Sequence, residues 1–135
     1  QQARELLEAL GLDFLQGLDL QKIKLKKVDL RGVDLSGGTL RQATLTDLNM
    51  QNANLSYTDL STSNLVKVNL KDANLNKANL SDATFNKSNM KRANLHGANL
   101  NSANLSKTNL SGANLSQVDF CKGNLKETNL TKANF

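Results

Sequence analysis

Residues 91–115 read KRANLHGANLNSANLSKTNLSGANL, and a leucine closes every group of five residues in this stretch. The pattern extends in both directions: from Leu20 to Phe135, Leu, Met or Phe occupies every fifth position without exception, and 19 of these 24 repeat centres are Leu. The residue before a centre is usually Asn or Asp, and the residue two before it is usually small or β-branched. The chain is therefore a repeat protein with a period of five residues.

A period of five suits neither a helix nor a straight strand. Five helical steps of about 100° spread successive centres around the whole helix. In an extended strand an odd spacing sends successive centres to opposite faces. The chain must therefore bend once per repeat, so that each repeat forms one short side of a closed coil with its centre pointing inward. Asn before each centre suits these bends, because its side chain hydrogen-bonds nearby backbone and tolerates unusual dihedral angles.

The residue two before each centre indicates an even number of sides per coil. Alternate sites from Ile23 hold Ala in eight of 12 cases, whereas the intervening sites from Val28 hold Ala in two of 11. Val28 and the five sites that follow it at intervals of 20 residues contain no Ala. Four sides satisfy this pattern and three do not, although duplication of a ten-residue unit would leave a similar signal.

Units such as Ala73-Asn74-Leu75 and Ala113-Asn114-Leu115 resemble the pentapeptide-repeat family, whose consensus is A(D/N)LXX. The resemblance covers residues 18–135. It implies an all-β fold, a right-handed quadrilateral β-helix in which the centres and the residues two before them fill the interior. With four repeats per coil, the 24 repeats of this domain predict about six coils.

The segment ahead of the repeats, residues 1–17, is expected to form a short N-terminal α-helical cap and a connector. Ala3, Leu6, Leu7 and Leu10 fall on one face of a helix, and a glycine follows them as a stop signal. A cap of this kind covers the strand edges of the first coil, which otherwise recruit other chains. A linker helix from an upstream domain is the alternative interpretation.

The last coil is the candidate for self-association. Phe120 and Phe135, two of the three Phe centres, both lie in it. The family resemblance implies that such a coil can join two copies end to end, so a homodimer through Phe120 and Phe135 is a hypothesis.

Composition and chemistry argue against an enzyme. No run approaches the roughly 18 apolar residues that a membrane span needs. The lone Cys121 leaves no intramolecular disulfide and no cysteine-based metal site, which suits a reducing compartment, so we expect a cytoplasmic protein. His96 is the one candidate base, but its column neighbours Asn76 and Ser116 include no carboxylate to orient it. We expect no catalytic residue, metal or cofactor.

Two outward surfaces are candidates for binding. The first is a basic stripe. It comprises Lys67, Lys71, Lys87, Lys91, Arg92 and Lys107. A solvated face is the ordinary interpretation of such charge, and contact with nucleic acid or an acidic protein is the sharper one. The second is a nearly uncharged face that could contact a protein partner. It includes Tyr57, Asn76, His96 and Gln117, with Tyr57 as the most anchor-like residue.

These features favour a non-catalytic scaffold or protein–protein interaction module, bacterial in style and expected as a regulatory domain of a larger protein. The best-known activity of the family is inhibition of DNA gyrase by acidic rods that resemble duplex DNA. From residue 20 onward this chain has 16 basic and eight acidic residues, so such mimicry is disfavoured. The alternative is a topoisomerase-directed or nucleic-acid-binding protein, but no aromatic residue stands among the lysines to stack on bases. We expect a protein partner, of unknown identity, rather than nucleic acid.

Overall fold

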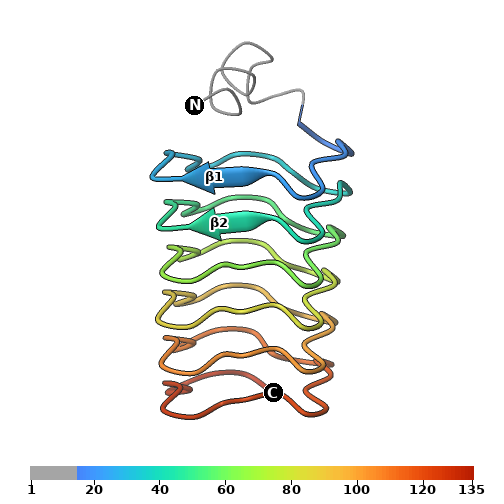
Figure 1. Cartoon of the computed structure of the whole chain (residues 1–135). Helices are drawn as coiled ribbons and strands as arrows, with labels where there is room; N and C mark the ends of the chain where they lie inside the picture. Colours follow the sequence, from blue (N-terminus) through green and yellow to red (C-terminus); the bar gives the residue numbers. More distant parts are fainter. Residues whose placement is uncertain (1–14) are drawn as a thin grey trace.

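The computed structural model describes residues 15–135, which wind into a stack of four-sided coils (Figure 1). Residues of successive coils pair in parallel at a constant offset of 20, as Asn54 pairs with Asn74 and Asn74 with Asn94. Four sides of five residues therefore make one coil, and the predicted quadrilateral β-helix is confirmed. The described residues contain no helix. The expected helical cap falls within residues 1–14, outside the described range.

The coil geometry is already present at the first described residues. Leu15 is fully buried one repeat before Leu20, and the N–H of Gly17 donates to the carbonyl of Ser36 in the next coil at 2.9 Å. The stacked arrangement therefore includes residues 15–17, which the sequence assigned to the connector.

Most sides of the coils pair through a single residue. Within the described range the only longer strands are β1 (Lys24–Lys26) and β2 (Thr44–Thr46), which pair in parallel with Leu25 opposite Leu45. They lie where two consecutive coils on one side both lack Asn or Asp before the centre. At most other sites an Asn or Asp side chain accepts a backbone N–H of the following turn, where the extended segment ends.

A complete set of hydrogen-bond partners explains why Asn dominates the position before each centre. Of the five backbone N–H groups in residues 75–79, two donate to the next coil, one to the preceding coil and one across the turn. The fifth, that of Asn76, donates to Oδ1 of Asn74 at 3.0 Å. An unpaired backbone donor is costly wherever water cannot reach it, which favours Asn or Asp as the side-chain acceptor at this position.

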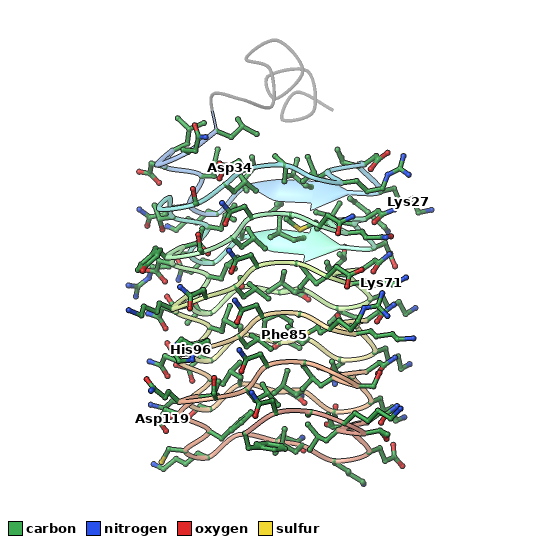
Figure 2. All side chains as sticks on the ribbon, turned by 180° about the vertical axis from the view of Figure 1, so that it is seen from behind. Lys27, Asp34, Lys71, Phe85, His96 and Asp119 are labelled. Atoms are coloured by element: carbon green, nitrogen blue, oxygen red, sulfur yellow. The ribbon has the colours of Figure 1, made fainter. Side chains whose placement is uncertain are left out.

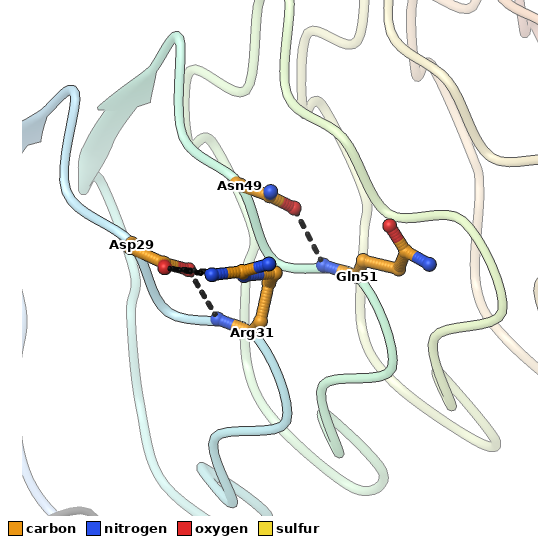
Figure 3. Close-up of polar contacts among 4 residues, drawn as sticks. All are labelled: Asp29, Arg31, Asn49 and Gln51. Carbon is orange, nitrogen blue, oxygen red and sulfur yellow. Dashed lines mark hydrogen bonds and ion pairs between the residues drawn. The ribbon is translucent and has the colours of Figure 1, made fainter.

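Two adjacent coils show the same side-chain contact (Figure 3). Oδ1 of Asp29 accepts the N–H of Arg31 at 3.1 Å, and Oδ1 of Asn49 accepts the N–H of Gln51 at 3.2 Å. The predicted hydrogen bonding of Asn to nearby backbone is therefore confirmed.

The unusual dihedral angle lies at a different position from Asn. The second residue after each centre has a positive φ throughout residues 17–132, and 19 of these residues are not glycine. A four-residue turn with positive φ only at its third residue is of type II. Closure of the turn thus imposes the left-handed conformation on whichever residue stands there.

The core consists of the centres and the residues two before them. Leu55, Leu60, Leu65 and Leu70, one from each side of a coil, are all fully buried. Phe85 lies in the middle of the rod (Figure 2) and is also fully buried. The predicted interior is therefore confirmed through the central coils. In the last coil burial falls, and Phe135 is 69% exposed.

Candidate interaction walls

Charged side chains are divided unequally among the four sides of the rod. We define the basic wall as the side with residues 28–30, its two bordering corners at residues 26–27 and 31–32, and their equivalents at intervals of 20 residues along the chain. Within residues 15–135 this wall holds 11 basic and four acidic side chains, and the remaining surface holds five of each. The basic wall therefore carries all the excess positive charge of the described residues.

The six residues predicted as a basic stripe all lie on the basic wall. Lys67, Lys87 and Lys107 stack along its first corner, one coil apart, and each is exposed. Lys71 and Lys91 stack along its second corner beside Arg92. Figure 2 shows Lys27, from the first corner, and Lys71, from the second, on the same side of the rod. The register between coils thus brings together side chains that are far apart in the sequence.

Ion pairs offset part of this charge. Three lie on the basic wall: Arg31 with Asp29 at 2.7 Å, Arg92 with Asp72 at 2.8 Å, and Lys107 with Glu127 at 4.0 Å. The hydrogen bonds from Arg92 hold the pKa of Asp72 below its usual range, and the charges of Arg92, Lys71 and Lys91 add to this effect. Within residues 15–135, the ammonium groups of Lys67, Lys71, Lys87 and Lys91 have no carboxylate within 4.0 Å. These four lysines keep their charge uncompensated by an ion pair.

A shallow hollow of about 340 Å³ opens at the second corner of the basic wall. It is lined by Lys91, Arg92, Ser111, Gly112, Thr131 and Lys132. Gly112 stands between Arg92 and Lys132 in the corner column, and its missing side chain leaves the corner open at that coil. Sequence reasoning missed this hollow. The sequence signal was a glycine, Gly112, with Arg92 20 residues before it and Lys132 20 residues after it. This spacing indicates neighbours only when the coil is known to have four sides of five residues.

A second hollow on the basic wall, of about 460 Å³, has a mixed lining. Two carboxylates, Asp29 and Asp47, lie there beside Lys27 and Arg31. Because Asp29 is paired with Arg31, this hollow has little excess charge and offers less attraction to an anion than the one at Gly112.

The predicted neutral face occupies the corner diagonally opposite the lysine column of the first corner. Tyr57, Asn76, His96 and Gln117 all lie at this corner, so the structure brings them together. Tyr57 is 60% exposed. The ammonium group of Lys77 lies 5.9 Å from the centroid of its ring, a cation–π contact that fixes the one charge of this corner against its tyrosine.

His96 and Ser116 are hydrogen-bonded in the direction opposite to that of a catalytic His–Ser pair. Its Nδ1 lies 2.7 Å from Oγ of Ser116, and that hydroxyl donates to Oδ1 of Asn114 at 2.6 Å. Oδ1 of Asn114 also accepts the N–H of Ser116, so it is an acceptor and takes the single hydroxyl proton. Nδ1 of His96 then carries a proton and donates to Oγ. A histidine that activates a serine must instead accept the hydroxyl proton.

The remaining chemistry-bearing residues form no centre in the described range. Across residues 15–135, no group of three His, Cys, Asp or Glu side chains is placed to hold a metal ion. Cys121 is exposed. The same residues include no helix with the length and apolar character to cross a bilayer.

A closed four-sided coil of five-residue repeats, with its chemistry confined to flat outer walls, defines the class of this protein as a repeat solenoid. Residues 23–100 match the family described as pentapeptide repeat region, and residues 98–135 match the family of pentapeptide repeats in eight copies. The chain belongs to the pentapeptide-repeat family, as its sequence pattern predicted.

Solved pentapeptide-repeat structures from cyanobacteria and a plant are similar to this chain. Rfr23 from the cyanobacterium Cyanothece 51142 is 26% identical with a TM-score of 0.62, and the match covers 89% of each chain. HetL of Nostoc sp. strain PCC 7120, involved in heterocyst differentiation regulation, is 29% identical with a TM-score of 0.51, covering 88% of this chain and 58% of HetL. A pentapeptide repeat protein from the thylakoid lumen of Arabidopsis thaliana is 28% identical with a TM-score of 0.52, covering 81% and 72%. No protein with a curated function matches the sequence significantly.

Proposed function

We propose that this protein is a non-catalytic scaffold that binds a protein partner through its outer walls. The segregation of charge is the observation that carries this proposal. Charged side chains that only keep a protein in solution can be spread evenly over its surface. Here the basic wall has 11 basic and four acidic side chains, whereas the remaining surface has equal numbers of basic and acidic ones. Such a difference between walls gives a partner one side to recognise.

The backbone supports the same function by making the walls rigid. In most repeats of the central coils all five N–H groups have partners, as in residues 75–79. The outward side chains therefore stand at fixed spacings of one coil, about 4.8 Å. A pre-organised surface loses little conformational entropy when a partner binds, which favours affinity.

The similarity to HetL and the positive charge of the basic wall support a regulatory scaffold over a topoisomerase-directed or nucleic-acid-binding protein. HetL, a protein similar to this chain, is involved in heterocyst differentiation regulation. A topoisomerase-directed DNA mimic needs an acidic wall, whereas the excess charge of the basic wall is positive.

Crosslinking tests the proposal. The full-length gene product is crosslinked in its native lysate, and crosslinked peptides are identified by mass spectrometry for the parent, for Lys67→Glu/Lys87→Glu/Lys107→Glu and for Tyr57→Ala/His96→Ala. We expect a discrete protein partner whose crosslinks map to one wall and disappear in the variant of that wall alone. A partner set that is unchanged in both variants, or crosslinks spread evenly over all four sides, would contradict the scaffold function.

A further inference from the structure

We infer that the basic wall binds an acidic segment of a protein partner, with one carboxylate of that segment seated in the hollow at Gly112. The inference rests on the proposed scaffold function and adds to it the chemistry of the partner and the side of the rod that binds it.

The central coils of the basic wall are the most positive part of the described surface. Between residues 66 and 111 this wall carries six basic side chains and a single acidic one, Asp72. The lysines form two parallel columns, and neighbours in a column stand one coil apart, about 4.8 Å. Charges this close and this exposed repel one another, so an anionic partner that lies across several coils lowers the free energy of the wall.

The hollow at Gly112 supplies both charge and hydrogen-bond donors. Lys91 and Lys132, which carry ammonium groups, belong to its lining together with Ser111 and Thr131, which carry hydroxyls. Within the described residues neither hydroxyl has a hydrogen-bond partner. A carboxylate has two oxygens that accept such donors, and bonds between a charged group and a hydroxyl or ammonium are the stronger kind.

The pairing of Arg92 with Asp72 and the lack of aromatic side chains on the basic wall favour an acidic protein segment over nucleic acid as its ligand. Arg92 is the one arginine among the central coils of the wall, and its Nε and Nη2 already donate to Asp72 at 2.8 and 3.1 Å. This side-on pair occupies Nε–H and one N–H of Nη2, so a phosphate can reach Arg92 only end-on, through the remaining N–H groups of Nη1 and Nη2 and beside the negative charge of Asp72. No aromatic side chain of the described residues lies on the wall to stack on a base, since Tyr57 stands at the neutral corner. An acidic protein segment needs neither feature.

Binding of fluorescent poly-L-glutamate to the full chain at low salt, followed by anisotropy, tests the wall. The wall variant is Lys67→Glu/Lys87→Glu/Lys107→Glu, and its control is Lys22→Glu/Lys77→Glu/Lys122→Glu. All six lysines are exposed and occupy the positive-φ turn position, so the two variants match in charge change and backbone geometry but differ in side. We expect at least about tenfold weaker binding for the wall variant and less than about threefold for the control. Equal losses would mean that net charge alone drives binding, and the inference would fall.

A second pair of variants tests the hollow. Gly112→Asp places a carboxylate in the hollow, and Gly97→Asp places one at the neutral corner. Both glycines have nearly the same φ, 67° and 68°, and an added Cβ at either lies 3.2 Å from Cγ of the residue one coil before. Strain and charge change therefore match. We expect binding of poly-L-glutamate to weaken at least about threefold for Gly112→Asp only, with circular dichroism unchanged in both. Equal effects would exclude the hollow.

Single-stranded oligothymidylate of equal charge is the competing probe. The inference predicts that it binds more weakly than poly-L-glutamate at the same salt concentration. Equal or tighter binding, lost in the wall variant, would assign the basic wall to nucleic acid instead. If poly-L-glutamate fails to bind while a protein partner still crosslinks to the neutral corner, this inference is wrong and the scaffold function stands.

Discussion

At the scale of the residue, two positions of each repeat bend the chain: the Asn before the centre and the second residue after it. In most repeats Asn accepts the one N–H that no carbonyl reaches, and its frequency in the sequence allowed us to predict this contact. The left-handed angle falls three residues later, on residues as varied as Tyr57, Thr62 and Lys67. Five glycines at this position are the signal that residue type offers, and at the other sites the geometry of the closed turn overrides the preference of the residue.

Asn74→Ala removes the acceptor of the Asn76 N–H. We expect the free energy of unfolding to fall by about 1–2 kcal/mol, because a half-buried backbone donor then loses its partner. Asn74→Asp keeps an oxygen at the same place and is the control, with an expected change well below that of the alanine variant. Equilibrium unfolding in guanidinium chloride measures both. Similar losses for Ala and Asp would show that the amide Nδ2, and not Oδ1, is the important group.

Thr62→Gly relieves a β-branched residue from the left-handed conformation, at φ 56°. The relief of about 1–2 kcal/mol exceeds the added chain entropy of glycine, so we expect a net stabilisation of about 0.5–1 kcal/mol. The neighbouring Ser61→Gly, at a residue with negative φ, should destabilise the protein instead. Thermal unfolding of both variants decides the matter, and a loss of stability in Thr62→Gly would show that its hydroxyl contact with the Ser61 carbonyl outweighs the strain.

Asp72 carries a pH-dependent contact. Its folded-state pKa is lowered by the hydrogen bonds of Arg92, so the pair stabilises the fold above the ordinary pKa of Asp and ceases to do so as pH falls through the lowered value. NMR titration should give a midpoint for Asp72 below 3.8 in the parent and a higher one in Arg92→Gln. The difference in stability between these two proteins should shrink as the solution becomes more acidic than the lowered pKa. An unchanged Asp72 midpoint in Arg92→Gln would remove the pair as its cause.

At the scale of the element, the column that begins at Val28 shows why three of its six inward sites hold Ser or Thr in place of alanine. The hydroxyls of Ser88, Thr108 and Thr128 donate to carbonyls of the preceding coil at 2.6–2.8 Å. These bonds tie successive coils together from inside. The absence of Ala was visible in the sequence and helped to fix the four sides. Its cause was not visible, because each accepting carbonyl belongs to a different coil and becomes a neighbour only when the coils stack.

Leucine burial should contribute unequally along the stack of coils. Leu80 is fully buried, whereas Leu125 in the last coil is only partly so. We expect Leu80→Ala to lower the free energy of unfolding by about 2–5 kcal/mol and Leu125→Ala by clearly less. Leu80→Met is the control for volume, with an expected loss below about 1.5 kcal/mol, since Met50 and Met90 already serve as centres. Equal costs for Leu80→Ala and Leu125→Ala would contradict the graded burial.

At the scale of the whole molecule, the sequence predicted the lysine columns but not how their charge is distributed. The spacing of 20 residues between Lys67, Lys87 and Lys107 predicts from the sequence that they lie in line on a four-sided coil. The pairing of Arg92 with Asp72 and the hollow at Gly112 depend on side-chain directions at corners, where no repeat pattern restrains the residue type. Outward positions vary freely because they do not contribute to the core, and a pattern search therefore says little about them.

The homodimer through Phe120 and Phe135 stays a prediction at this scale. The exposure of Phe135 leaves an apolar side chain at the end of the described stack. Sedimentation equilibrium of this chain should give a mass that rises with concentration toward twice 14.7 kDa, and Phe135→Glu should keep it at 14.7 kDa. His96→Ala, far from that end, should leave association unchanged. The mass of a single chain at all concentrations would refute the dimer.

The constant parallel offset between coils, 20 residues, gives insertions and deletions two different outcomes. Loss of five residues between Lys67 and Lys87 leaves every later leucine in register with the interior, yet it rotates everything downstream by a quarter turn and moves Lys87 and Lys107 off the line of Lys67. Loss of one whole coil shortens the rod and rotates nothing. Gain or loss of a single repeat therefore preserves folding, but only gain or loss of four repeats also preserves the alignment of the surface side chains. Length variants of such a chain should accordingly divide into those that still bind the partner and those that only fold.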